Sequence, residues 1–535
     1  MDVSGHLHAA LECHATSLAV SQTTEAPSGS IALVLLDVLI FHTLVGRRWL
    51  GFLADLVDIK RLTVLYIVCI QGALVLFGLL EGASVSRRVV VWHIRPAQTL
   101  VLSFVLLILV GTGLLMLPNA TTGPGSMPFL AALFTATSAV CVTGLIVVDT
   151  ATYFTTFGQG IILVLCQLGG LGILTFATVI GMMVRGNLGI REKTLLRDFV
   201  ASRQFGEMSA TVRRIVGLTF LIEALGALSL HSQWRQVWLT PEERLWHAVF
   251  HAVSAFCNAG FSTLHAGLAE PHTAMLPGVN LTIMLLIILG GIGFSVLWES
   301  GRWVLRVPQR RARRLSVQSR LVWMVTAMLI LGGAGLFAVL EAHGVLAGHA
   351  AGERVLAALF QSITARTAGF NTVAIERLAV PTVVLLLILM LIGASPGSTG
   401  GGIKTTTVAV LGLTTLATIR NKARVEAFRR TLPWEVIHQA YATFFFAIGV
   451  ITLALFILSI TETHAFLDLF FEEVSAFATV GLSRGITASL SPTGKCVIIV
   501  SMFVGRVGSL TLGVALARQV TSTAYEYPTE TVSIA

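Results

Sequence analysis

Four short stretches of the 535-residue sequence end in a glycine that follows small or polar residues. They read Cys141-Val142-Thr143-Gly144, Cys257-Asn258-Ala259-Gly260, Arg366-Thr367-Ala368-Gly369 and Ala478-Thr479-Val480-Gly481. The glycines recur at intervals of 116, 109 and 112 residues, and a serine (Ser138, Ser254 or Ser475) stands six residues before three of them. A period this regular indicates duplicated structural units.

The chemistry that suits such motifs is coordination of a dehydrated cation. Backbone carbonyls can replace the water around an ion when an extended chain turns them toward one axis. Glycine permits the backbone angles this requires and keeps side chains out of the ion path. A single glycine motif would favour helix packing, but four copies at a common period favour a filter. Thr479-Val480-Gly481 also echoes the T-V-G core of potassium-channel filters. We therefore predict that backbone carbonyls of the four motifs coordinate a monovalent cation.

The composition is that of a membrane protein. Hydrophobic residues make up 55% of the chain and charged residues 12%, whereas a soluble domain carries about 25% charged residues. The six cysteines show no paired spacing and are read as apolar packing residues. The net charge of +9 is clustered between apolar runs without a nucleic-acid-binding pattern, which favours membrane lipid over nucleic acid as a partner.

Eight apolar runs are long enough to cross about 30 Å of hydrocarbon. They cover residues 99–117, 158–184, 215–230, 275–297, 321–340, 383–419, 437–460 and 495–517. Within each consecutive pair lies a shorter semi-apolar stretch, at 129–145, 245–261, 355–370 or 466–482, that holds one glycine motif. These stretches are too short to span and too apolar for exposed loops, so we expect re-entrant segments.

The positive charges predict the orientation. Arginine and lysine are dense in the connections 185–214, 302–320 and 420–430 and sparse in those that carry the re-entrant stretches. The dense connections are therefore expected in the cytoplasm. Docking of an acidic or regulatory cytosolic partner is an alternative use of the same clusters.

We therefore predict an all-α, multi-pass protein of the cell membrane, with four pseudo-symmetric helix, pore-loop and helix units around one central pore. The expected units are residues 95–200, 201–312, 313–430 and 431–535, the last including a C-terminal tail. Residues 1–94 form an N-terminal extension, in which the apolar runs 31–50 and 62–80 predict two additional membrane helices.

The third unit contains a glycine-rich, polar stretch at 393–404 inside an apolar span. Its backbone cannot face lipid, because its polar groups would lack partners, so it must lie beside a water-filled cavity. A phosphate-binding loop is excluded, since Ile403 rather than glycine precedes Lys404. From the sequence, this is the only clear break in the second helix of a unit.

These motifs together resemble the Ktr/Trk/HKT superfamily of potassium transporters, and most closely the Ktr-type membrane subunit. The resemblance runs from about Arg95 to Ala517 and includes Arg95-Pro-Ala-Gln98, the four glycine motifs and Gly393 to Thr405. It implies that the motifs form the filter and that glycine at all four positions favours K⁺ over Na⁺. K⁺ is then the transported ion and Na⁺ a candidate activator, with no covalent cofactor.

The resemblance also implies a gate. The family's intramembrane gate loop matches Gly397, Ser398, Thr399, Gly400, Gly401, Gly402 and Lys404, and Arg506 matches an arginine that projects into the pore beside it. An arginine at this depth costs about 2.5 to 3.5 kcal/mol on insertion scales, so it should face a polar cavity or, alternatively, pair with an acid. The resemblance further implies a homodimer and a separate cytosolic ring of Ktr/Trk-type nucleotide-binding regulatory subunits.

Four acidic residues have competing interpretations. Asp149 could concentrate cations at the outer mouth or cap a helix. Glu472 and Glu473 could do the former, but a role in capping or bracing the re-entrant helix is favoured. Glu223, the only acidic residue inside the eight runs, reads as a buried hydrogen-bond or ion-pair partner, with an ion-coupling site as the alternative.

The leading hypothesis is gated, channel-like potassium uptake driven by the membrane potential. The alternative is a secondary active symporter of a cation or small solute, which would show intramembrane acids and broken helices in two inverted halves. No enzyme is expected. His247 and His251 lie four residues apart but lack a third metal ligand, so a cap or interface role is favoured.

Overall fold

The computed structural model describes residues 96–123, 125–183, 208–237, 240–270, 276–306 and 315–508. In these ranges the regular structure is helical apart from one hairpin, β1 Glu426–Ala427 and β2 Arg430–Thr431. The predicted all-α class is confirmed. The two additional helices expected at 31–50 and 62–80, and most of the basic connection 185–214, lie outside the described residues.

The main helices recur four times in the same order: a long helix, a short helix and a second helix. The four groups are α5 Pro96–Leu115, α6 Phe129–Val140 and α8 Thr156–Met183; α10 Met208–Gln233, α11 Pro241–Cys257 and α12 Pro277–Ile292; α14 Val317–Leu340, α15 Ala351–Thr364 and α16 Val380–Leu391; and α18 Trp434–Thr461, α19 Phe466–Phe477 and α20 Pro492–Val507. α13 Phe294–Arg306 and α17 Thr405–Ile419 continue the second and third groups. Each predicted re-entrant stretch therefore contains a short helix.

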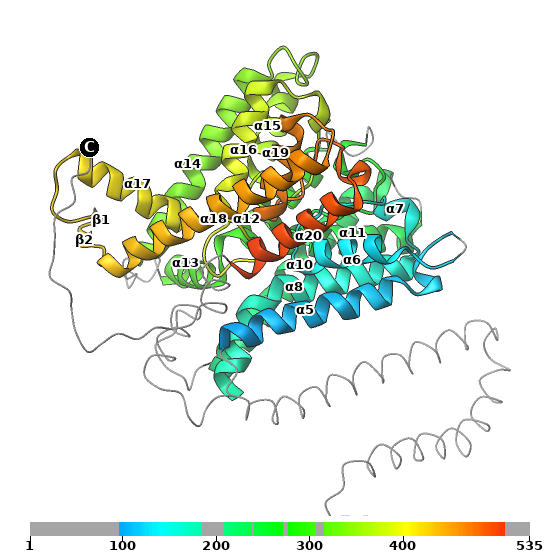
Figure 1. Ribbon diagram of the computed structural model, residues 1–535, viewed down its shortest axis with the longest axis horizontal. Helices are drawn as coiled ribbons and strands as arrows, with labels where there is room; N and C mark the ends of the chain where they lie inside the picture. The colour runs from blue at the N-terminus through cyan, green and yellow to red at the C-terminus, as the bar shows by residue number, and fades with distance from the viewer. Residues whose placement is uncertain are drawn as a thin grey trace, which may run out of the picture. The chain divides into compact units, whose positions relative to one another are not determined.

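Small elements complete the connections. They are α7 Thr150–Tyr153 and the 3₁₀ helices η3 Pro118–Ala120, η5 Trp234–Gln236, η6 Gly267–Ala269, η7 Ile375–Arg377 and η8 Thr487–Ser489. α17 and α18 pack side by side and lead to the β1–β2 hairpin, which lies at one extreme of the fold (Figure 1).

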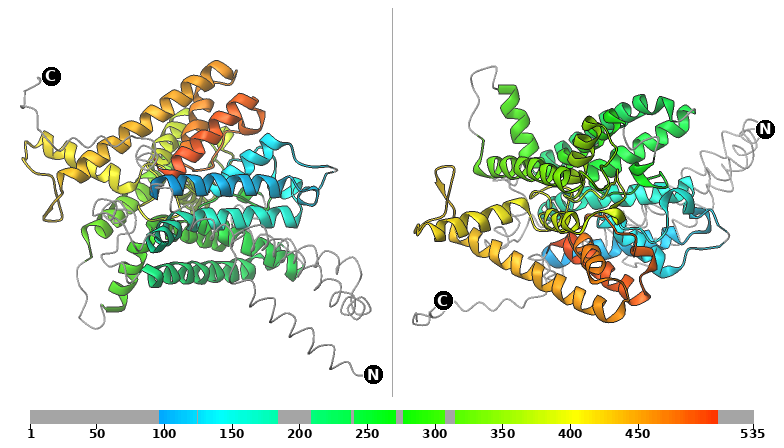
Figure 2. Two further views of the ribbon diagram at one scale, coloured as in Figure 1. Left: turned by 60° about the horizontal axis from the view of Figure 1, so that its bottom comes forward. Right: turned by 90° about the horizontal axis from the view of Figure 1, so that it is seen from above.

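The four groups contact one another in a closed cycle. The second helix of each group packs on the short helix of the next, α8 on α11, α12 on α15, α16 on α19 and α20 on α6. The last contact returns to the first group, so the short helices surround a common centre, and the groups can be followed around it in Figure 2.

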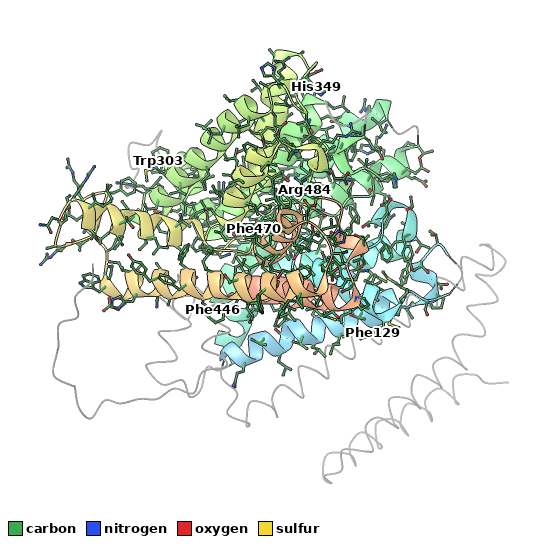
Figure 3. The ribbon with its side chains drawn as sticks, turned by 45° about the horizontal axis from the view of Figure 1, so that its top comes forward. Phe129, Trp303, His349, Phe446, Phe470 and Arg484 are labelled. Carbon is green, nitrogen blue, oxygen red and sulfur yellow. The ribbon has the colours of Figure 1, made fainter. Side chains whose placement is uncertain are left out.

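The outer surface of the helices suits a bilayer. Among the described residues, Arg214–Gln233, Val317–Leu340 and Trp434–Thr461 are long and apolar enough to span it, and α12 with α13 would make a fourth span. Large apolar side chains lie on the outside, including Phe129, which is 58% exposed, Phe446 and Trp303 (Figure 3). An apolar exterior of this extent marks a lipid-facing surface, as expected of a multi-pass membrane protein.

The second helix of the second group is broken. α12 ends at Ile292, and α13 leaves it at an angle of 107°. Gly293 provides the bend with a φ of +97°, a left-handed value that glycine adopts without strain. The expectation that only the third group is interrupted is therefore wrong.

The two breaks satisfy each other's backbone groups. The hydrogen bonds run from Thr399 N to Gly290 O, from Ser395 N to Gly291 O and from Phe294 N to Gly397 O, at 3.2, 3.0 and 3.0 Å. In hydrocarbon the freed ends of α12 and α13 would have no partners. The bend at Gly293 and the 393–404 loop are thus one structural feature, which explains why the second group must break where the third group does.

Glycines bring the second helices close to the ends of the short helices. The sequences are Gly169-Gly-Leu-Gly172, Gly290-Gly-Ile-Gly293 and Gly505-Arg-Val-Gly508. A Cβ on the first glycine of each would collide with a carbonyl oxygen, that of Val140, Phe256 or Phe477, four residues before the motif glycine of its group. This G-x-x-G repeat was not among the predicted motifs, although it is visible in the sequence.

The close contact at Gly505 predicts a loss of stability on adding a methyl group. Gly505→Ala should destabilise the fold by about 1 to 3 kcal/mol, the usual range for overpacking. Gly412→Ala is the matched control, because Gly412 also lies in a helix but has no atom within 4 Å of an added Cβ. Thermal unfolding of the two purified variants in detergent checks this, and equal transition temperatures would contradict the close packing.

Candidate functional site

The structure brings the four glycine motifs together. A Cβ added to any one of the four glycines would lie close to the Cα of the next. The Cβ-to-Cα distance is 3.1 Å from Gly144 to Gly260, 3.1 Å from Gly260 to Gly369, 3.2 Å from Gly369 to Gly481 and 3.1 Å from Gly481 back to Gly144. The sequence places these residues more than 100 positions apart. Together they form a closed cycle, which we call the four-glycine ring.

The backbone repeats around the ring. The four glycines have φ values of +90°, +71°, +77° and +90°, and the residues two before them, Val142, Asn258, Thr367 and Thr479, are left-handed as well, at +58°, +59°, +71° and +50°. A left-handed conformation costs a non-glycine residue roughly 1 to 2 kcal/mol. Strain kept at four equivalent positions indicates a functional constraint.

These left-handed residues end the short helices. In the first group, Val142 N bonds to Ala139 O at 3.1 Å and Thr143 N to Ser138 O at 2.8 Å, the pattern of a Schellman cap. The second and fourth groups repeat both bonds, whereas in the third group Ala368 N reaches Thr364 O at 3.0 Å. The chain therefore turns sharply from each helix into the ring.

The ring offers oxygens to a positive charge. A Cβ on each ring glycine would collide with the carbonyl oxygen of the residue before the neighbouring glycine, namely Thr143, Ala259, Ala368 or Val480. Side chains are thus excluded where these carbonyls converge. The four short helices end just before the ring, and their C-termini carry the negative ends of the helix dipoles. Both features favour a bound cation.

Hydroxyl groups tie the ring to the short helices. Ser138 and Ser475, two of the serines that the sequence aligned, accept hydrogen bonds from the amides of Gly144 and Gly481, each at 3.1 Å. The other two bonds run from Ser254 Oγ to Phe261 O at 2.7 Å and from Thr364 Oγ1 to Phe370 O at 2.6 Å. Thr364 was not identified from the sequence, because it stands five rather than six residues before its glycine.

The remaining motif residues lie around the ring. Cys141 and Ala478 are C-caps of α6 and α19, Cys257 is the last residue of α11, and all three are buried. Arg366 is buried too, and its side chain donates to Thr326 Oγ1 of α14 at 3.4 Å. These side chains pack behind the ring, and the backbone faces it.

The 393–404 loop lies against the ring on the side where the short helices end. Gly401 N donates to Thr479 Oγ1 at 3.1 Å, and Thr399 Oγ1 donates to Phe256 O at 3.2 Å. A Cβ on Gly400 would collide with Thr367, two residues before Gly369. A Cβ on Gly402 would lie against Ala478, three residues before Gly481. Most of the residues predicted for this loop, 398–401, are buried, while Gly397, Gly402 and Lys404 are half-buried.

Two cations hold the loop. Lys404 Nζ donates to Gly400 O at 2.7 Å. Arg506, which is 2% exposed, donates to Thr399 O and, at 2.5 Å, to Gly169 O of α8. No ion pair of Arg506 is present in the described part of the chain. Arg506 therefore connects the first group, the fourth group and the loop through carbonyl groups.

Three of the acidic residues take structural partners. Asp149 is the N-cap of α7 and accepts from Ala151 N at 2.9 Å, so the capping interpretation is confirmed, and it also contacts His265. Glu223 accepts from Gln167 Nε2 at 3.1 Å. Glu472 accepts from Ser483 Oγ at 2.9 Å, and Glu473 is fully buried in the same helix.

The two histidines of α11 bond to the chain beyond the ring. His247 Nδ1 lies 2.5 Å from Thr263 Oγ1, and His251 Nε2 lies 2.9 Å from Ser262 Oγ. Both contacts join the short helix to the irregular segment that follows Gly260. This is the interface role that the sequence favoured over a metal site.

With this geometry in view, residues 95–526 match the family model of TrkH, described as a cation transport protein. The chain belongs to the TrkH family. The Ktr system potassium uptake protein B of Bacillus subtilis is 38% identical over 440 residues, which cover 81% of this chain and 95% of that protein. The potassium/sodium uptake protein NtpJ of Enterococcus hirae is 33% identical over 462 residues, covering 84% of this chain and 100% of its own length.

The TrkH fold is also found in a solved structure. The crystal structure of the potassium transporter TrkH from Vibrio parahaemolyticus matches with a TM-score of 0.62 at 20% identity, over 78% of this chain and 83% of that one. The resemblance to the superfamily that the motifs indicated is therefore confirmed, and the helical architecture is that of TrkH proteins.

The ring contacts predict what a side chain at a ring glycine would cost. Gly481→Ala adds left-handed strain and a collision with Thr143 O, so we expect a loss of about 3 kcal/mol or more in the free energy of unfolding. Gly348→Ala separates the two effects, since Gly348 has a φ of +87° but no atom within 4 Å of an added Cβ. It should lose about 1 kcal/mol. Thermal unfolding that ranks the two variants equally would contradict the closed ring.

Proposed function

We propose that this chain is the ion-translocating membrane subunit of a Ktr/Trk-type potassium uptake system. K⁺ enters through the four-glycine ring, driven by the membrane potential, and loses water to the carbonyl groups of the four motifs. The observation that carries the proposal is the closed ring of four glycines with carbonyl oxygens beside each one. The similarity to two relatives named Ktr system potassium uptake protein B supports it.

The ring is the proposed filter, and the four helix groups are its proposed pseudo-symmetric units, with the boundaries 95–200, 201–312, 313–430 and 431–535. Selection arises because fixed carbonyls replace the hydration shell of K⁺ better than that of the smaller Na⁺. Glycine at every ring position keeps the four sides alike. Na⁺ acts as an activator in the proposal, and NtpJ is titled a potassium/sodium uptake protein.

The 393–404 loop and Arg506 form the proposed gate. The loop contacts residues just before the ring glycines, and Arg506 holds it by bonds to Thr399 O and Gly169 O. Two positive side chains, Lys404 and Arg506, next to the exit of the filter repel K⁺ while the loop is in place. Opening requires that these hydrogen bonds break and the loop moves aside.

Partners complete the proposal. Two chains form a homodimer with separate pores, and a separate cytosolic ring of nucleotide-binding subunits controls the gate from the side of the basic connections. The two Ktr relatives are named as proteins of a Ktr system, which is consistent with further subunits. The contact surfaces are the expected cytoplasmic connections 302–320 and 420–430.

A symporter is less well supported. The break at Gly293 gives each half of the chain one broken helix, which was one feature expected of a symporter. The backbone groups at the two breaks, however, bond to each other, so those groups are not available to hold a substrate. Glu223 is hydrogen-bonded to Gln167, as a structural residue would be.

Uptake in a potassium-transport-deficient host tests the function. Cells that express the wild-type chain with a cognate regulatory subunit should accumulate K⁺ and Rb⁺ and grow at low K⁺. In Gly144→Ser, the new side chain displaces the carbonyl of Ala259, so the ratio of K⁺ to Na⁺ uptake should fall by about tenfold. The ratio is independent of how much folded protein each strain makes.

Absence of K⁺ and Rb⁺ uptake by the expressed wild type would overturn the function itself. An unchanged ratio in Gly144→Ser would instead remove this glycine from ion selection. The Gly348→Ala variant controls for strain away from the ring, because its site is unobstructed.

The gate predicts faster flux when the loop is released. Arg506→Gln shortens the side chain and removes its charge, so it should raise K⁺ flux into proteoliposomes by several-fold, and a chain shortened within 397–402 should do the same. Arg377→Gln is the control, since Arg377 is exposed in η7, away from the loop and from the expected cytoplasmic connections. Flux equal to the wild type in both loop variants would contradict the gate.

A further inference from the structure

Beyond the ring, the irregular segments that follow three of its glycines are held by side chains of the short helices. The contacts are His251 Nε2 with Ser262 Oγ at 2.9 Å, Gln361 Nε2 with Thr372 Oγ1 at 3.4 Å and Glu472 Oε2 with Ser483 Oγ at 2.9 Å. The helix residue stands eight or nine positions before the ring glycine, and the hydroxyl stands two or three after it. Three groups thus contain the same device, which we call the outer brace.

The brace of the fourth group makes the most contacts. Glu472 is fully buried, and its two carboxyl oxygens accept from different hydroxyls, those of Ser483 and Thr487. The two hydroxyls also lie 3.0 Å apart. A buried carboxyl that accepts two bonds holds both partners in place, because an unpaired polar group is costly in a low-dielectric setting.

The brace of the second group is also doubly fixed. His251 Nδ1 lies 2.8 Å from His247 O, one helical turn earlier, which sets the orientation of the imidazole ring that meets Ser262. His251 is fully buried. Its position nine residues before Gly260 equals that of Glu472 before Gly481.

The first group lacks this contact. Its corresponding residues are Thr135 and Ile146, and the Thr135 hydroxyl has no hydrogen-bond partner among the residues the structure describes. Ile146 cannot form a hydrogen bond through its side chain. The segment after Gly144 is therefore held near the ring by Ser138 but has no outer brace of this kind.

We propose that Glu472 is a positioning residue for ion selection, acting through Ser483 and Thr487 on the segment that follows Gly481. The inference rests on the proposed function. Because the brace ties the outer end of this segment to α19, it limits how far the carbonyls beside Gly481 can close around an ion smaller than K⁺. Loss of the brace allows that closure, so Na⁺ gains affinity relative to K⁺.

The test compares K⁺ and Na⁺ binding to the full-length chain. Calorimetry with KCl and NaCl should give Glu472→Ala a K⁺ to Na⁺ affinity ratio at least about tenfold below the wild type, since a lost bond of this type changes equilibria by that order. Glu472→Gln should restore part of the ratio, because its amide oxygen still accepts one hydroxyl.

Glu341→Ala is the matched control. Glu341 is an equally buried glutamate, but its carboxyl accepts from the backbone amides of Ala379 at 2.9 Å and Val345 at 3.1 Å, which lie outside the segments that follow the ring glycines. It should lower the unfolding temperature and leave the ratio unchanged. A merely structural role of Glu472 would give the same pattern.

The outcomes separate the two proposals. A wild type that does not prefer K⁺ overturns the proposed function and the inference with it. A wild type that prefers K⁺, with unchanged ratios in both Glu472→Ala and Ser483→Ala, overturns the inference alone. If Glu472→Ala fails to fold, Ser483→Ala decides, because it removes one hydroxyl and keeps the buried carboxyl bonded to Thr487.

Discussion

Where a helix is interrupted inside a membrane, the backbone N–H and C=O groups that lose their helical hydrogen bonds need other partners in the protein, because hydrocarbon offers none. This constraint explains the centre of the fold. The 393–404 loop interrupts the third group, and three of its backbone groups, Ser395 N, Gly397 O and Thr399 N, bond to α12 and α13 on either side of the bend at Gly293. One break therefore requires the other. The ring, the loop and the bend form a single hydrogen-bonded assembly around which the longer helices pack.

The electrostatics of this assembly have opposite signs on its two sides. The ring presents carbonyl oxygens and the negative ends of four short helices. On the other side lie Lys404 of the loop and Arg506 of α20, which donate hydrogen bonds to carbonyl groups rather than pairing with acids. In the proposed function these two cations oppose the passage of a third. Displacing the loop removes the positive charge and exposes the carbonyls, so the same hydrogen bonds that stabilise the closed form define what must break on opening.

The four groups share a backbone plan and differ in side chains. At the position of Gly170 and Gly291, the fourth group has Arg506, and this one difference supplies the contact between the loop and α8. The outer braces differ likewise, with a histidine, a glutamine and a glutamate in three groups. Close backbone contacts require glycine at the repeated positions, whereas the residues around them differ between groups and make different contacts.

The sequence by itself determined the helical membrane class, the four glycine motifs and the glycine-rich loop, because apolar runs, periodicity and the conformational freedom of glycine act locally and leave a pattern along the chain. It also identified the family through those motifs. Only the tertiary structure decided that a helix breaks at Gly293, that Arg506 bonds to carbonyls rather than to an acid, and that Glu472 holds the segment after Gly481. Each of these depends on groups brought together by folding, and a hydrogen bond between residues distant along the chain leaves no periodic signal.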